Sequence, residues 1–177
     1  MRLARMRWGA LAALLSSAAL AVPAGGGVED IDGFHRIDAK VAVGATPAPA
    51  QVAGLAEAGF RSLLNLREES EIDSAPVALA AKDAGLTYLR APISSKQPTD
   101  AAATEFLRIT DEASIYPVFI YCASGNRAAA LWMVRRVLRD GWTLEAAQAE
   151  AERAGLTSPA MREFALGYIE RHATERN

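Results

Sequence analysis

The residues whose types and spacing suit chemistry lie in one short stretch, Cys122-Ala123-Ser124-Gly125-Asn126-Arg127. The apolar run Pro117–Tyr121 before it is typical of a strand buried on both faces, and a helical pattern begins near Asn126. The stretch is therefore expected to be a loop that leads from a strand into a helix. Because free backbone N–H groups at a helix N-terminus bind anions, such a loop could hold an oxyanion.

Cys122 and Arg127 are the two candidate catalytic residues. A helix N-terminus and a nearby guanidinium both favour a thiolate, which would make Cys122 a nucleophile. Arg127 could bind two oxygens of a tetrahedral oxyanion, and Gly125 could adopt the positive φ of a tight turn. The alternative is that the chain's single cysteine is a packing residue, because free cysteines are often buried. The candidate substrate-binding groups are the backbone amides of Ala123, Ser124, Gly125 and Asn126.

Strand and helix patterns alternate along the chain. Strand patterns occur within Phe34–Ala45, Phe60–Leu66, Leu86–Pro92 and Pro117–Tyr121. Helix patterns cover Pro47–Ala58, Ala75–Gly85, Thr99–Ser114, Asn126–Asp140, Leu144–Ala154 and Pro159–His172. This alternation predicts a three-layer α/β domain, with a mostly parallel sheet and helices on both faces. Ligands bind such sheets beyond the carboxyl ends of the strands, where the 122–127 loop is expected.

The first 24 residues have the pattern of a signal peptide. Three arginines precede the apolar run Trp8–Val22, and small residues follow it up to Ala24. We expect cleavage after Ala24, or alternatively after Ala21, then a flexible segment over 25–33 and a single domain over 34–177. A bacterial protein of this kind would be periplasmic or secreted, with no stable membrane insertion after cleavage. The alternative is an uncleaved N-terminal anchor.

Composition excludes several classes of protein. The chain has 177 residues, 19 basic and 21 acidic, with one cysteine and two histidines. One cysteine cannot form an intramolecular disulfide, and no spacing of cysteine and histidine suggests a structural zinc site. A net charge of −2 lacks the basic surplus that nucleic-acid binding usually requires. The expected partner is a phosphorylated substrate or a small oxyanion.

With its flanking segments, the loop resembles bacterial protein tyrosine phosphatase-like proteins related to dual-specificity phosphatases. This group includes the phosphatase-like domain of beta-lactamase hydrolase-like proteins. The likeness extends from about Phe34 to Gly155 and, beyond the loop, rests on Gly59–Glu71, Tyr88–Ile93 and Asp140–Leu156. It implies a cysteine-phosphatase-like fold and the hydrolysis of phosphate monoesters, of the phosphotyrosine or dual-specificity type, through a thiophosphate intermediate. The nucleophile then falls on Cys122 and the phosphate-binding arginine on Arg127, with no cofactor and no metal.

The sequence departs from the phosphatase pattern at four places. Four residues, instead of five, separate the cysteine from the arginine, and Tyr121 occupies the position of a common histidine. Ala128 follows the arginine where a serine or threonine is usual. Ser94 and Ser95 stand where the general acid of a dual-specificity enzyme would be expected. Asp100 could serve as the acid, although capping the following helix is the favoured interpretation.

These departures favour two alternatives. The Cys-x-x-Gly-x-Arg pattern after a tyrosine also resembles the active loop of single-domain rhodaneses, sulfurtransferases whose cysteine carries a persulfide. The upstream segments typical of a rhodanese are not found, so the flanking sequence favours the phosphatase lineage. A non-catalytic oxyanion-binding module is the third interpretation.

Arginines outside the loop are also assigned expected roles. Arg67 lies just past a predicted strand and is expected either to line the mouth of the pocket or to pair with acidic neighbours at the surface. A basic run on the helix after the loop, formed by Arg135, Arg136 and Arg139, is interpreted as a solvated face.

Overall fold

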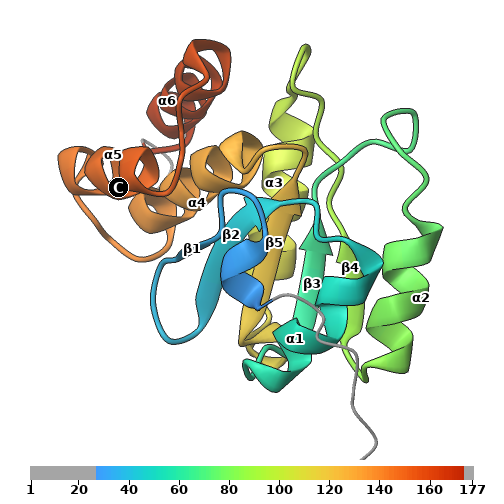
Figure 1. Ribbon diagram of the computed structural model, residues 1–177. Coiled ribbons are helices and arrows are strands. Elements are labelled where there is room, and N and C mark those ends of the chain that lie inside the picture. Colours follow the sequence, from blue (N-terminus) through green and yellow to red (C-terminus); the bar gives the residue numbers. More distant parts are fainter. Residues whose placement is uncertain (1–26, 174–177) are drawn as a thin grey trace, which may run out of the picture.

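Five strands form the central sheet in the order β1-β2-β5-β3-β4 (Figure 1). They are β1 (His35–Arg36), β2 (Val41–Ala45), β3 (Ser62–Asn65), β4 (Thr87–Arg90) and β5 (Val118–Cys122). Only β1 is antiparallel to its neighbour. The computed structural model describes residues 27–173, so the predicted signal peptide over 1–24 lies outside the described residues.

Helices cover both faces of this sheet, which confirms the predicted three-layer α/β fold (Figure 1). The helices are α1 (Val52–Glu57), α2 (Ala75–Asp83), α3 (Asp100–Thr110), α4 (Asn126–Leu138), α5 (Leu144–Arg153) and α6 (Pro159–Ala173). Short 3₁₀ turns lie at Val28–Asp30, Pro49–Gln51 and Ala113–Ile115. Within residues 27–173, no helix combines the length and apolar character needed to cross a membrane.

The central strand β5 divides the core into two layers. Phe119 and Tyr121 pack on the side of α1 and α2, whereas Ile120 and Cys122 pack on the side of α3 to α6. Because successive side chains of a strand point to opposite faces, a strand covered on both faces must be apolar throughout. All five residues of β5 are buried, as the apolar run predicts.

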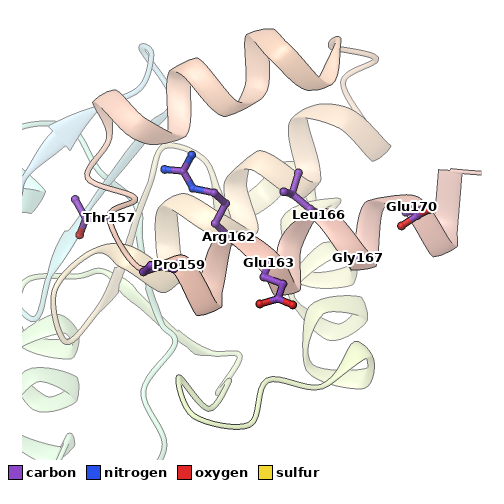
Figure 2. Close-up of a pocket in the computed structure, with 7 residues that line it drawn as sticks. All are labelled: Thr157, Pro159, Arg162, Glu163, Leu166, Gly167 and Glu170. Atoms are coloured by element: carbon purple, nitrogen blue, oxygen red, sulfur yellow. The ribbon is translucent and has the colours of Figure 1, made fainter.

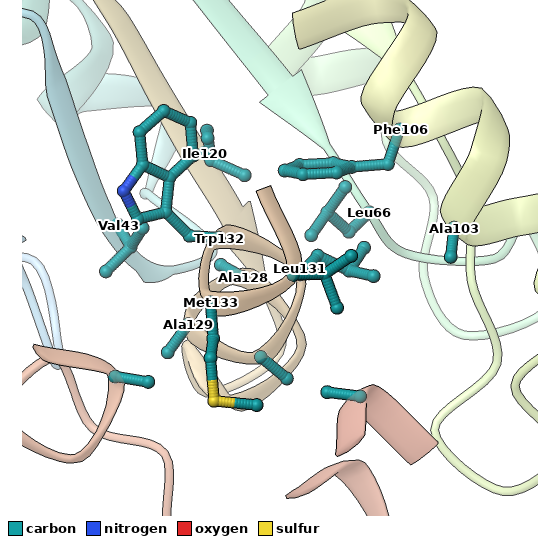
Figure 3. Close-up of a cluster of buried hydrophobic side chains, with 14 of the residues drawn as sticks. Val43, Leu66, Ala103, Phe106, Ile120, Ala128, Ala129, Leu131, Trp132 and Met133 are labelled. Carbon is teal, nitrogen blue, oxygen red and sulfur yellow. The ribbon is translucent and has the colours of Figure 1, made fainter. Parts of the chain in front are cut away.

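Helix α4 lies close against the sheet because its buried face begins with small residues. Ala128 and Ala129 are buried, and Leu131 and Trp132 fill the space toward α3 and β2 (Figure 3). This packing holds the first turn of α4 at the carboxyl end of β5. The loop between the two elements therefore lies at the edge of the sheet where ligands bind α/β folds.

The segment before β1 packs against the domain. The predicted flexible region 25–33 lies partly outside the described residues, but Val28–Asp30 forms a 3₁₀ turn and Ile31 is buried beside α1 and α2. The N–H of Ala45 donates to the carbonyl of Asp32, which ties this segment to the end of β2.

The interpretation of this basic run as a solvated face holds for Arg139, which is 42% exposed, but is wrong for Arg135 and Arg136. The side chain of Arg136 is only 11% exposed and pairs with Glu150, Asp140 and Asp38. Its guanidinium also lies 4.4 Å from the centroid of the Trp142 ring. Asp140 is four residues along the chain and lies within reach by helical spacing, whereas the convergence of Asp38 and Glu150 on the same guanidinium depends on the tertiary structure.

Candidate active site

Cys122 is the last residue of β5 and is 1% exposed. The backbone N–H of Gly125 donates to its Sγ at 3.1 Å. Its carbonyl accepts a hydrogen bond from the Thr46 hydroxyl at 3.0 Å, and Ala45 is its register partner on β2. The sulfur is therefore held inside the turn, facing a backbone donor.

A left-handed glycine allows the chain to turn from β5 into α4. Gly125 has φ = 88° and is the N-cap of α4, with its carbonyl accepting from the N–H of Ala129. A residue with a Cβ would be strained in this conformation. Ala123 and Ser124 are exposed while Gly125 is buried, so the two exposed residues form the outer rim of the loop.

Arg127 lies in the first turn of α4 and is 3% exposed. Its Nη1 and Nη2 donate to Oε1 and Oε2 of Glu71 at 2.5 and 2.6 Å. Nη1 also donates to the carbonyl of Ile93 at 2.8 Å and is 3.5 Å from the carbonyl of Leu66. These acceptors follow β3 and β4, so three strand ends meet at one guanidinium.

The Glu71–Arg127 pair is charged over the whole physiological pH range. The hydrogen bonds from Arg127 lower the pKa of Glu71 from 4.5 to about 2, against the opposing effect of burial. Burial alone would lower the pKa of Arg127, but Glu71 and the nearby Cys122 outweigh it and raise that pKa. Glu71 is therefore a fixed anion and cannot act as a proton donor near neutral pH.

The Nε side of the Arg127 guanidinium has no oxygen acceptor among residues 27–173, and Arg127 also interacts with Cys122. Nη1 and Nη2 make all the contacts described above, whereas no oxygen within residues 27–173 accepts from Nε. The N–H of Gly125 donates to Cys122 Sγ, and the Arg127 guanidinium interacts with the same side chain. Together they can hold a tetrahedral oxyanion beside a thiol.

Arg67 forms an ion pair with an acidic neighbour, which is one of the two roles expected of it, although its side chain is only 15% exposed. Its Nε and Nη2 contact the side chain and carbonyl of Glu71, which is an ion pair with an acidic neighbour. Its Nη1 donates to Thr46 Oγ1 at 3.1 Å, and Thr46 in turn binds the carbonyl of Cys122. Arg67 thus joins the Glu71 carboxylate to the backbone of the candidate nucleophile.

The side chain of Asn126 fixes the loop against the start of α6. Its Oδ1 accepts from the N–H groups of Thr157 and Ser158 at 2.8 and 2.7 Å, and its Nδ2 is 3.3 Å from Ser124 Oγ. A hollow begins at Thr157 and follows α6 as far as Glu170 (Figure 2). Asn126 therefore uses its side chain to shape the loop, while its backbone amide lies at the helix start.

Tyr121 faces away from the loop, into the other core layer. Its hydroxyl lies 3.2 Å from that of Tyr88, which also accepts from Asn65 Nδ2. Burial raises the pKa of Tyr121 well above its ordinary value. The residue before the cysteine is therefore a core residue, and its ionisation plays no part at neutral pH.

The prediction that Asp100 caps α3 is wrong, because Thr99 is the N-cap and accepts from the N–H of Ala102. Asp100 instead binds Arg171 through both carboxylate oxygens, which lowers its pKa. Arg171 lies near the end of α6, whereas Asn126 contacts the residues just before its start. The Asp100 carboxylate is therefore bound to α6, and no contact joins it to the 122–127 loop among residues 27–173.

Glu71 and Thr46 are the site residues that sequence reasoning missed. Glu71 belongs to an acidic cluster with Glu68 and Glu69, and no spacing distinguishes the member that reaches Arg127. Thr46 has no motif around it. Within residues 27–173, no group of three or more histidine, cysteine or acidic side chains could hold a metal ion.

Comparisons with known proteins agree with this architecture. A DUF442 protein from Shewanella putrefaciens superimposes with a TM-score of 0.70 at 17% identity, covering 82% of this chain and 96% of that one. The catalytic core of the PP-IP phosphatase SIW14 from Saccharomyces cerevisiae gives a TM-score of 0.66 at 21% identity, covering 83% and 94%. These likenesses show that the fold is that of the cysteine phosphatases.

Sequence relatives give the family. A beta-lactamase hydrolase-like protein from Xylella fastidiosa is 32% identical over 108 residues, which is 58% of this chain and 24% of that protein. The chain thus spans only about a quarter of that relative's length. The family model of the phosphatase-like domain of such proteins matches residues 33–139, more than half of the chain and the whole of the 122–127 loop. The chain therefore belongs to the family of phosphatase-like domains of beta-lactamase hydrolase-like proteins.

Proposed function

We propose that this protein is a cysteine-dependent phosphatase that hydrolyses phosphate monoesters. The observation that carries the proposal is the shared loop of Cys122 and Arg127. The sulfur faces a backbone N–H, and the buried Arg127 guanidinium interacts with it while no oxygen among residues 27–173 accepts from Nε. Membership in a phosphatase-like family supports the same conclusion.

The reaction would proceed in two displacements at phosphorus. The Cys122 thiolate attacks in line, forming an S–P bond as the bond to the leaving oxygen breaks. Arg127 and the loop amides hold the equatorial oxygens, whose charge they stabilise in the transition state. Water then attacks phosphorus, the S–P bond breaks, and inorganic phosphate and the thiolate are released.

The surroundings of the loop limit the substrates to those with good leaving groups. Glu71 is a fixed anion, Asp100 is bound to Arg171, and Ser94 stands at the position of the expected acid. Without a general acid, an alkoxide leaving group would depart about 10²–10⁴ times more slowly. Aryl phosphates, phosphotyrosine among them, are therefore the proposed substrate class.

The test is the release of phosphate from an activated aryl phosphate and from a simple alkyl phosphate. We expect slow turnover of the aryl ester, much slower turnover of the alkyl ester, and none of either by Cys122→Ser. Ser158→Ala, which alters a residue outside the loop and keeps its N–H bond to Asn126, is the matched control and should retain activity. Equal rates for both esters would contradict the absence of an acid.

Sulfur transfer is the second candidate, and the four-residue spacing of the loop favours it. Thiolate attack on the outer sulfur of thiosulfate would form a Cys122 persulfide and release sulfite, a leaving group that needs no general acid. The measurement is the mass of the protein after incubation with thiosulfate, followed by thiocyanate formation with cyanide. A gain of one sulfur on Cys122 without phosphate release from aryl esters would replace the phosphatase proposal.

We also propose that the protein works after export, in the periplasm or outside the cell. The charge and apolar pattern of residues 1–24 supports this, and sequencing the N-terminus of the exported protein tests it. A mature chain that begins near Gly25 is expected, while an intact Met1 on a membrane-bound product would indicate an anchor.

A further inference from the structure

The carboxylate of Glu71 is fixed from its own loop as well as by Arg127. The backbone N–H of Glu68 donates to its Oε1 at 2.9 Å, and Arg67 Nε lies 3.4 Å from its Oε2. Both oxygens also accept from Arg127. A carboxylate held in this way sets the plane of the guanidinium that it binds, because the two parallel hydrogen bonds fix the orientation.

We propose that Glu71 is a positioning residue: it orients Arg127 so that the guanidinium keeps its Nε edge for the oxyanion bound beside Cys122. Arg67 extends this arrangement, since it contacts Glu71 and also Thr46, which binds the Cys122 carbonyl. The proposal rests on the proposed function only for the identity of the oxyanion as a phosphate.

A positioning role and a purely electrostatic role predict opposite results. If Glu71 acted only through its negative charge, removing it would make the site more positive and would strengthen anion binding. If Glu71 orients Arg127, removing it frees the guanidinium to turn, and anion binding weakens. A displacement of about 1 Å in a group that positions a substrate can lower the reaction rate on the order of 10²-fold.

The experiment measures how inorganic phosphate protects Cys122 from alkylation by iodoacetamide, which requires no turnover. In Glu71→Gln, the phosphate concentration for half-protection should rise about 10- to 100-fold, as expected for the loss of a hydrogen bond to a charged ligand. Glu71→Asp keeps the charge but is one methylene shorter, so an intermediate rise is expected. The matched control is Glu69→Gln, which alters an 82% exposed carboxylate of the same loop that pairs with Arg90, and it should match the unaltered protein.

Thermal unfolding and near-UV circular dichroism would establish that each variant is folded, and Glu71→Asp retains the ion-pair charge if Glu71→Gln does not fold. Protection of a folded Glu71→Gln equal to or tighter than that of the unaltered protein would overturn the inference, as would an unaltered protein that phosphate does not protect. If protection depends on Glu71 but aryl phosphates are not hydrolysed, the inference stands and the proposed function fails. If hydrolysis occurs and is unchanged in Glu71→Gln, only the inference fails.

Discussion

Helix α4 carries two arginines that are each bound by a glutamate but differ in their roles. Arg127 in its first turn binds Glu71, and Arg136 in its last turns binds Glu150 with Nε and Nη2 at 2.8 and 3.1 Å. Arg136 also uses Nη1 for Asp140 and Nη2 for Asp38. Every nitrogen of Arg136 therefore has an oxygen acceptor, whereas Nε of Arg127 has none among residues 27–173 and the guanidinium interacts with Cys122.

The difference shows that burial and ion pairing alone do not identify a functional arginine. Arg136 is further enclosed by stacking on Trp142 and Trp132, so no edge of its guanidinium is available to a ligand. Arg127 lies at the end of the sheet, beside the loop amides and Cys122. The available donor, and its place at the carboxyl ends of the strands, distinguish a candidate binding residue from a structural one.

The largest expected effect separates the two arginines by activity. Arg127→Lys should lower the turnover of an aryl phosphate about 10²–10³-fold, because an ammonium cannot bind Glu71 through two parallel hydrogen bonds and also hold a fixed donor at the oxyanion. Arg136→Lys should change turnover per folded molecule less than about twofold. Steady-state rates with the two purified variants decide this, and comparable losses in both would remove the distinction between the sites.

The Arg136 ion pair should contribute to the free energy of unfolding and not to activity. Glu150→Gln leaves Arg136 buried without its main carboxylate and should reduce the free energy of unfolding by about 3 kcal/mol. Urea unfolding followed by circular dichroism measures the change, and phosphate protection of Cys122 should be unaffected. Loss of protection in a variant that is still folded would mean that the two arginines are coupled through α4.

Acid should weaken the Glu71–Arg127 pair only at very low pH. The pKa of Glu71 is lowered from 4.5 to about 2, so its stabilising contribution is present above about pH 4.5 and is lost as the pH falls toward 2. The difference in unfolding free energy between the unaltered protein and Glu71→Gln should therefore be constant near neutral pH and shrink below pH 4.5. A difference that begins to fall at pH 6 would place another titrating group in the pair.

The smallest effect is expected at Asp100, which contacts neither Arg127 nor Arg136. Its carboxylate is 42% exposed and binds Arg171, which is also exposed, so solvent screens the pair. Asp100→Asn should leave the turnover of aryl phosphates within about twofold and the pH profile unchanged. A flattened acidic limb of that profile would show instead that Asp100 donates the proton to the leaving group.

Local pattern in the sequence determined the main elements and the central loop. The apolar run before Cys122, the positive φ available at Gly125 and the helical pattern after it predict a strand, a turn and a helix with Arg127 in the first turn. These features depend on neighbours within a few residues, which periodicity and turn chemistry describe well. The same reasoning predicted a three-layer fold, although helix ends shifted by a few residues and Thr99, not Asp100, caps α3.

The tertiary structure alone decided which partners reach the loop. Glu71 meets Arg127 across 56 residues of sequence, and Thr46 meets the Cys122 carbonyl across 76. Both contacts depend on the strand order, which places β5 between β2 and β3 so that the segments after these strands converge on one edge of the sheet. Periodicity records which face of an element is buried but not which element lies beside it. For that reason the sequence could locate Arg127 and Arg136 on one helix without showing which guanidinium has a donor that no oxygen of residues 27–173 accepts from.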